Sequence, residues 1–160
     1  MKFRKILVPT DFSSNAQLAF NEAYHLARET GAALDVLHVQ TEAALRTAVK
    51  ENLVQPGFSN EDVKQAVEEL QDARFAQLTA GTVSDIPVRC VTVRGEPHAS
   101  IVEYALENKA DLMVVGLRGT GAANRIRASL LGSVAEAMIR KSPCPVVVVR
   151  PDHDIEPAGA

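Results

Sequence analysis

The sequence contains no tryptophan, and aromatic residues make up only 4% of its 160 residues. A folded core must therefore be built from aliphatic side chains, which a hydrophobic content of 46% can supply. At about 100–200 residues per domain, a chain of this length fits one domain. We expect residues 1–150 to form that domain and residues 151–160 to form a disordered tail.

A basic surplus and long apolar runs are also missing. The chain has 17 Lys and Arg against 20 Asp and Glu, which argues against a general nucleic-acid-binding protein. No apolar run approaches the roughly 18 residues of a membrane span. The apolar run after the basic N-terminus is only Ile6–Val8, too short for a secretory leader. We therefore expect a cytoplasmic protein with neither a nucleic-acid nor a membrane partner.

Residues that hold metals or form covalent intermediates are scarce. The two cysteines, Cys90 and Cys144, lack metal or redox spacing, and we expect each to be a small buried side chain. The four histidines form no pair with ligand spacing, so we expect no metal site. The chain has no G-x-x-x-x-G-K-[ST] loop, and no base neighbours Ser13 or Ser133. We therefore expect no catalytic residue and at most weak ATP hydrolysis.

What the chain does contain is a set of short, nearly continuous apolar segments, which is typical of parallel strands covered on both faces. They are Lys5–Val8, Leu34–Val39, Val88–Val93, Leu112–Val115 and Val146–Arg150. Helical patterns lie between them. The alternation predicts an α/β fold, namely a single doubly wound five-stranded parallel sheet with strand order 3-2-1-4-5 and helices on both faces.

The helical segments carry recognisable start signals. Ser14 with Gln17 three residues later predicts a capping box at the first helix, and Ser59 is the expected N-cap of the second. Residues 41–59 look like a short helix and a turn at Pro56-Gly57. Acidic residues recur along the second helix, where we expect a solvent-exposed face: Glu61, Asp62, Glu68, Glu69 and Asp72.

In a sheet of this order, ligands bind beyond the carboxyl ends of the first and fourth strands, where the winding reverses. The loop after the first strand is Pro9–Ser14. One interpretation is a turn in which Asp11 or a serine caps the following helix. The other places Asp11 over the crevice, where its carboxylate can accept hydrogen bonds from a ribose or an adenine amine.

The loop after the fourth strand is rich in glycine and arginine. Gly116 and Gly119 would let the backbone approach a ligand, and Gly132-Ser133 begins a helix whose N–H groups attract phosphate. Residues 112–150 carry a net charge of +5 in a chain of net charge −3. Three arginines of this stretch, Arg118, Arg125 and Arg127, lie within the loop. The alternative is a flexible surface loop with scattered arginines.

These loops and strands together resemble the universal stress protein family. The matching segments are Lys5–Ser13, Leu37–Val39, Gly95–Pro97, Ala110–Gly116, Leu131–Ala135 and Pro143–Val149. In ATP-binding members of the family the glycine loop reads G-x-x-G, nine residues, then G-S or G-T. Gly116, Gly119, Gly132 and Ser133 match these positions, but the linker Thr120–Leu131 has twelve residues, and Arg118 stands where many members have His.

The resemblance implies a stress-response protein that binds an adenine nucleotide, first ATP and alternatively AMP or cAMP, with Mg²⁺ as an optional companion of ATP. It places the Val39 backbone against the base and Val115 beside it. The glycines and Ser133 would then surround ribose and phosphates. The expected nucleotide-binding residues are Pro9, Thr10, Asp11, Val39, Val115, Gly116, Arg118, Gly119, Gly132, Ser133 and Val134.

Three functions stay open at this point. The favoured one is a non-enzymatic regulatory or interaction protein controlled by a nucleotide, whose protein partner the sequence does not identify. The others are a nucleotide-independent interaction module of the same fold and a slow ATPase. The resemblance further implies a homodimer through Val146–Arg150, because an unprotected edge strand readily pairs with another chain.

Overall fold

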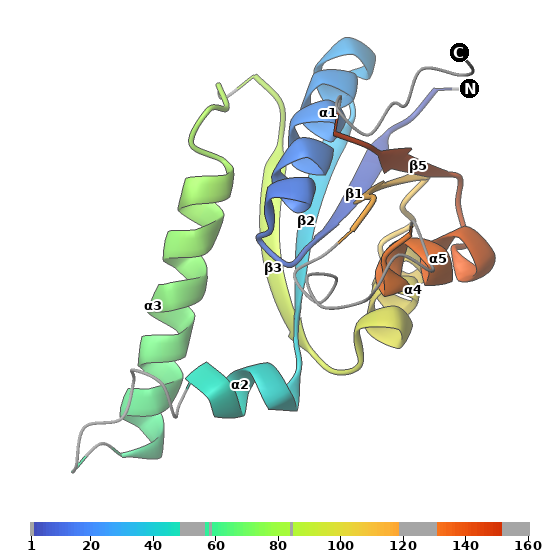
Figure 1. The fold of residues 1–160 in the computed structure, drawn as a ribbon. Coiled ribbons are helices and arrows are strands. Elements are labelled where there is room, and N and C mark those ends of the chain that lie inside the picture. Colours follow the sequence, from blue (N-terminus) through green and yellow to red (C-terminus); the bar gives the residue numbers. More distant parts are fainter. Residues whose placement is uncertain (1, 49–56, 58, 84, 119–130, 152–160) are drawn as a thin grey trace, which may run out of the picture.

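The computed structural model describes residues 2–48, 57, 59–83, 85–118 and 131–151 (Figure 1). Five parallel strands form one sheet in the order β3-β2-β1-β4-β5. Their bounds are β1 Lys5–Thr10, β2 Ala33–Gln40, β3 Val88–Arg94, β4 Leu112–Gly116 and β5 Val146–Val149. The predicted fold class and strand order are confirmed.

Five helices accompany the sheet: α1 Ser14–Thr30, α2 Glu42–Ala48, α3 Asn60–Leu78, α4 Pro97–Glu107 and α5 Ser133–Lys141. Two apolar clusters show how they cover it. One joins α1 and the end of α3 to one face, which we call the α1–α3 face, and the other joins α4 and α5 to the opposite face, the α4–α5 face. Residues of β2 alternate between them, with Val36 on the first and Leu37 on the second.

The starts of α1 and α3 follow local hydrogen-bonding rules. The Ser13 hydroxyl accepts the Ala16 N–H at 3.2 Å, so Ser13 is the N-cap and the predicted box at Ser14 and Gln17 is wrong by one residue. Gln17 instead donates to the Leu78 carbonyl at 2.9 Å, which fastens α1 to the end of α3. The α3 prediction is confirmed, because Ser59 forms a capping box with Asp62.

The edge of the sheet at β3 differs from the prediction of a buried strand. Every residue of β3 is at least partly exposed, because β3 is the edge strand and few α3 side chains, among them Phe75 and Leu78, are buried. Cys90 is accordingly exposed, so the prediction of two buried cysteines is wrong for Cys90, while Cys144 is partly buried. The acidic residues of α3 are exposed, as predicted.

The amino end of the sheet holds a buried charge that is fully paired. Asp35 on β2 is 3% exposed and accepts two hydrogen bonds from Arg89, at 3.1 and 2.6 Å, and one from Tyr104 at 3.1 Å. The Lys5 ammonium lies 3.7 Å away. Burial, together with the Asp35 charge and hydrogen bond, raises the pKa of Tyr104 to about 12, so its hydroxyl remains a donor.

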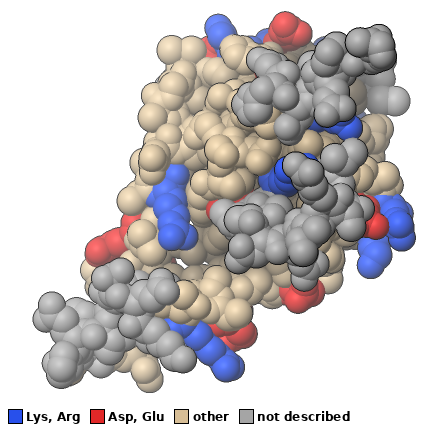
Figure 2. Space-filling view, in the orientation of Figure 1, with Lys and Arg blue, Asp and Glu red and all other residues tan. Residues whose placement is uncertain are grey.

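Surface properties add two observations. On the face shown in Figure 2, basic and acidic side chains lie interspersed and much of the described surface carries neither charge. None of the helices in the described parts of the chain combines the length and apolar character needed to cross a membrane.

Candidate functional site

The predicted site residues on β1, β2 and β4 lie at the carboxyl ends of these strands. Thr10 at the end of β1 pairs with His38 of β2, and β1 pairs on its other side with β4, which ends at Val115 and Gly116. Val39 is the penultimate residue of β2, and Pro9 directly precedes Thr10. The topology therefore brings the two predicted loops next to each other, at the point where the winding reverses.

A shared apolar cluster joins the predicted aliphatic residues. Val39, Val115 and Val134 all pack into the cluster of the α4–α5 face, although they come from β2, β4 and the first turn of α5. Val115 is 1% exposed, so its side chain belongs to the core beneath the carboxyl ends of the strands. Val39 and Val134 are only partly buried, which leaves apolar surface at this edge.

The loop after β1 is a tight turn held by its own side chains. The Asp11 carboxylate accepts the Ser13 N–H at 3.0 Å, and the Thr10 hydroxyl accepts the Phe12 N–H at 3.0 Å. Phe12 adopts a left-handed conformation with φ of 62°, which is rare for a bulky side chain. Ser13 therefore caps the helix, while the exposed Asp11 holds the turn that precedes it.

Aromatic contacts hold Phe12 in this conformation. Its ring centroid lies 4.8 Å from that of His38 and 5.1 Å from that of Phe75. The His38 Nδ1 atom lies 3.0 Å from the Thr10 carbonyl oxygen. Burial, assisted by the nearby Arg74 charge, lowers the pKa of His38, against the opposing effects of the Thr10 carbonyl and Asp11. No sequence pattern indicates this cluster, since its members come from three separate segments of the chain.

The close packing of β4 against α1 leaves no room for a side chain at Gly116. A Cβ at this position would lie 2.6 Å from the Asn15 carbonyl oxygen and 2.8 Å from its carbonyl carbon. The end of β4 therefore passes directly against the backbone of the first turn of α1. The Asn15 Oδ1 atom is buried there and has no hydrogen-bond partner among the residues that the structure describes.

The chain leaving β4 is clamped where it leaves and where it returns. The Leu117 N–H donates to the Val149 carbonyl at 2.9 Å, and the Gly132 N–H donates to the Leu117 carbonyl at 2.8 Å. Leu117 is 3% exposed, which anchors this junction in the core. These two hydrogen bonds hold the start of α5 next to the end of β4.

The first turn of α5 presents backbone donors at this junction. Gly132 is the N-cap, in an extended conformation, and it has no side chain that could cap the N–H groups of Ser133, Val134 and Ala135. Such a terminus carries a partial positive charge that favours anions. Arg118 is exposed and directly follows Leu117, whose carbonyl accepts the Gly132 N–H, whereas the predicted Gly119, Arg125 and Arg127 lie outside the described residues.

Metal and covalent chemistry find little support in what is described of the chain. Across those residues no three His, Cys, Asp or Glu side chains are grouped so that they could hold a metal ion. The Ser13 hydroxyl accepts a backbone N–H, and no described histidine is hydrogen-bonded to it. Backbone donors at the first turn of α5 beside the partly buried Val39 and Val134 suit an anionic ligand with an apolar portion.

Comparisons with known proteins agree on one family. The family model described as "Universal stress protein family" matches residues 2–150. The universal stress protein YxiE of Bacillus subtilis is 32% identical over 155 residues, covering 92% of this chain and 99% of that protein.

Solved structures also have this fold. The structure of hypothetical protein MJ0577 superposes with a TM-score of 0.73 at 26% identity, covering 94% of this chain and 98% of that one. A universal stress protein in complex with cAMP superposes with a TM-score of 0.62 at 23% identity, covering 93% and 98%. The chain therefore belongs to the universal stress protein family.

Proposed function

We propose that this protein is a cytoplasmic, non-enzymatic stress-response protein that binds an adenine nucleotide, with ATP ahead of AMP and cAMP, in the crevice between the loops after β1 and β4. The base would lie against the Val39 backbone, and the phosphates would lie at the first turn of α5. Pro9, Thr10, Asp11, Val115 and Gly116 would form the floor between them. Arg118 and Gly119 would complete the phosphate side.

The start of α5 carries this proposal. The Leu117–Gly132 hydrogen bond holds an uncapped helix terminus beside the carboxyl end of β4, and Val134 of that turn packs with Val39 and Val115. An anion-binding terminus next to apolar surface matches a nucleotide, which joins phosphates to a planar base. Mg²⁺ would accompany ATP through phosphate oxygens, because described protein ligands for it are lacking. A universal stress protein with the same fold has been solved in complex with cAMP, an adenine nucleotide, which supports the proposal.

The test is to release bound nucleotide from the purified protein and then to titrate ATP, AMP and cAMP by calorimetry. We expect saturable ATP binding that Asp11→Ala abolishes and Asp11→Asn weakens less, because asparagine keeps the acceptor for the Ser13 N–H. Absence of binding at millimolar nucleotide would refute the proposal. Efficient ATP turnover unaffected by Asp11→Ala would place the site elsewhere and favour an ATPase.

A nucleotide-independent interaction module is the second candidate, and two observations favour it. Gly116 is required by the close approach to Asn15, and Asp11 holds its own turn, so both have roles without a ligand. If this candidate is right, ATP leaves the melting temperature unchanged. Deleting three residues from Thr120–Leu131 would restore the nine-residue linker of the ATP-binding family members. Comparing ATP binding by this variant and by the wild type would test whether linker length decides between nucleotide binding and a nucleotide-independent module.

We further propose a homodimer in which β5 pairs with its copy. β5 is an edge strand, and Val147 is 43% exposed. The Pro145 and Val149 carbonyls accept bonds from β4, so the alternation of a strand directs the Val148 N–H to the open edge. Val148→Pro should therefore weaken the dimer without breaking the β4 ladder, and sedimentation of the wild type as a monomer would contradict the proposal.

A further inference from the structure

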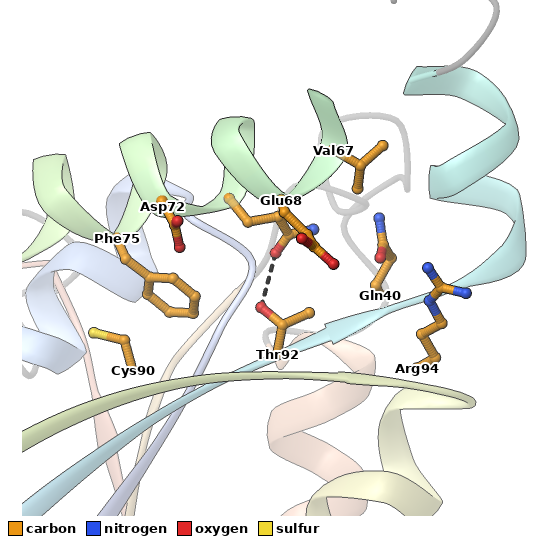
Figure 3. Close-up of a pocket in the computed structure, with 9 residues that line it drawn as sticks. Gln40, Val67, Glu68, Asp72, Phe75, Cys90, Thr92 and Arg94 are labelled. Carbon is orange, nitrogen blue, oxygen red and sulfur yellow. Dashed lines mark hydrogen bonds between the residues drawn. The ribbon is translucent and has the colours of Figure 1, made fainter. Parts of the chain in front are cut away.

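A concave region lies on the opposite face of the sheet from the proposed nucleotide site. A hollow of about 360 Å³ separates α3 from the carboxyl ends of β2 and β3 (Figure 3). Gln40 lines it, whereas the preceding residue, Val39, packs on the α4–α5 face. Because neighbouring strand residues point to opposite faces, the hollow belongs to the α1–α3 face and is separate from the proposed nucleotide site.

Two amides line this hollow deep below the surface. Gln40 and Gln71 are each only 7% exposed. The Gln71 Oε1 atom accepts a hydrogen bond from the Thr92 hydroxyl at 3.0 Å, which is the dashed line in Figure 3. Figure 3 shows the Gln40 side chain pointing from β2 toward α3, and no described residue hydrogen-bonds to its amide. Of the described polar side-chain atoms, only the Asn15 Oδ1 atom is both fully buried and unpaired, so the Gln40 amide is accessible from the hollow and free to hydrogen-bond a ligand there.

The rim of the hollow separates charges of opposite sign. Arg94 is the register partner of Gln40 on β3 and forms no ion pair with a described residue. Glu68 and Asp72 stand one turn apart on α3, and neither forms an ion pair within the described parts of the chain. Figure 3 shows Arg94 beside Gln40 at one end and Asp72 beside Phe75 at the other, with Glu68 between them.

We propose that this hollow binds a small zwitterion of the α-amino acid class. The ligand carboxylate would pair with the Arg94 guanidinium and accept an N–H from the Gln40 amide, a charge-assisted arrangement. Its ammonium group would lie at Glu68, which Figure 3 shows between Arg94 and Asp72, because both charges of an α-amino acid are attached to one carbon. The side chain would lie toward Phe75, which is 7% exposed and provides apolar surface.

Other ligand classes fit the same groups less well. A phosphorylated anion would meet two carboxylates for one guanidinium, and a neutral polyol would leave all three charges unpaired. The volume falls within the range of about 300–1,000 Å³ that small-molecule sites occupy. The presence of a guanidinium and carboxylates around one hollow is thus the feature that selects a zwitterion.

The experiment is a titration of the isotope-labelled full chain with single α-amino acids, up to about 10 mM, followed by backbone amide shifts. We expect at least one amino acid to give saturable shifts at Thr92 and Arg94. The N-acetylated and the carboxamide forms of that amino acid should each bind at least about tenfold more weakly, because each form removes one charge.

Matched variants test the roles of the rim. Arg94→Gln should weaken binding of the amino acid by about ten- to a hundredfold, and Glu68→Gln should also weaken it. Arg140→Gln, an exposed arginine on α5, should have no effect. All three residues are exposed, so the melting temperatures of the variants should match that of the wild type.

The proposal is overturned if no amino acid shifts these amides, if Arg94→Gln or the blocked forms bind equally well, or if glucose or inorganic phosphate binds in their place. It stands independently of the proposed nucleotide function. ATP added to the same sample should shift the first turn of α5 without displacing the amino acid, so either site can fail alone.

Discussion

The two ends of the sheet differ in whether their buried polar groups have hydrogen-bond and ion-pair partners. At the amino end, Asp35 is 3% exposed and paired with Arg89, Tyr104 and Lys5. The Asp111 carboxylate there accepts the backbone N–H groups of Arg4 and Lys5, at 2.9 and 3.2 Å. Each of these carboxylates therefore has several partners within the fold.

The carboxyl end leaves comparable groups unsatisfied. Among the described residues the Gln40 amide and the Asn15 Oδ1 atom lack hydrogen-bond partners, and α5 begins without a side-chain cap. Phe12 adopts an unfavourable left-handed conformation at the same end. This conformation does not distinguish the two ends, since Lys109, two residues before Asp111 at the amino end, has φ of 54°. From the unpaired polar groups we infer that the amino end stabilises the fold and the carboxyl end binds ligands.

The largest expected effect is at the amino end. Asp35→Ala should lower the free energy of unfolding by about 3 kcal/mol in urea denaturation, at the lower limit for breaking a buried ion pair. The loss is at that limit because the Arg89 side chain is 52% exposed and can be hydrated. Lys64→Ala, which removes an exposed ion pair with Glu61, should cost no more than about 0.5 kcal/mol. A similar loss of unfolding free energy in both variants would mean that the buried Asp35 contributes no more to stability than an exposed ion pair.

Gly116→Ala tests the packing of the carboxyl end. Its Cβ would meet backbone atoms of Asn15 below 3 Å, so we expect a loss of about 1–3 kcal/mol in the same assay. Nucleotide affinity should fall as well, since β4 must move away from α1. Gly81→Ala is the matched control because nothing lies within 4 Å of its Cβ. Wild-type stability in Gly116→Ala would contradict the close approach.

His38 gives the carboxyl end a pH dependence. Burial lowers the pKa of His38 in the folded protein below the ordinary value of 6.5. The unfolded chain therefore binds more protons as pH falls below about 6.5, and folding stability decreases there. His38→Gln should flatten the stability profile between about pH 7 and pH 5 relative to the wild type. An unchanged slope would show that other groups cause it.

The smallest expected effect is that of Gln40→Met. The buried amide has no described partner to lose, so thermal denaturation should show a change of less than about 0.5 kcal/mol or slight stabilisation. A loss above about 1.5 kcal/mol would assign Gln40 to the structural network, like Asp35, and would remove the contrast between the two ends.

The sequence predicted the strands well because their apolar runs are continuous. Each predicted strand lies within two residues of the observed bounds, and the apolar patterns also located the helices. Exposure of β3 was not predictable, since composition does not show that few α3 side chains reach the sheet. The predicted N-cap of α1, Ser14, is one residue later than the observed N-cap, Ser13, because serine suits this position equally well at either residue.

The candidate site was predictable in its position but not in its geometry. Loop chemistry and topology identified the neighbourhood of Asp11, Gly116 and Gly132. The contact of Gly116 with Asn15 and the Leu117–Gly132 bond depend on tertiary packing between distant segments. Gln40 and Gln71 come from different elements, with no spacing that would indicate a shared hollow.

The most direct test of the division between the two ends is backbone amide shift mapping with ATP. We predict saturable shifts at Ser133, Val134 and Ala135 in α5, at Asp11–Ser13 and at Val39, with Lys5 and Asp35 unmoved. Absence of saturable shifts, or shifts centred on Asp35 and Arg89 at the amino end, would contradict the account.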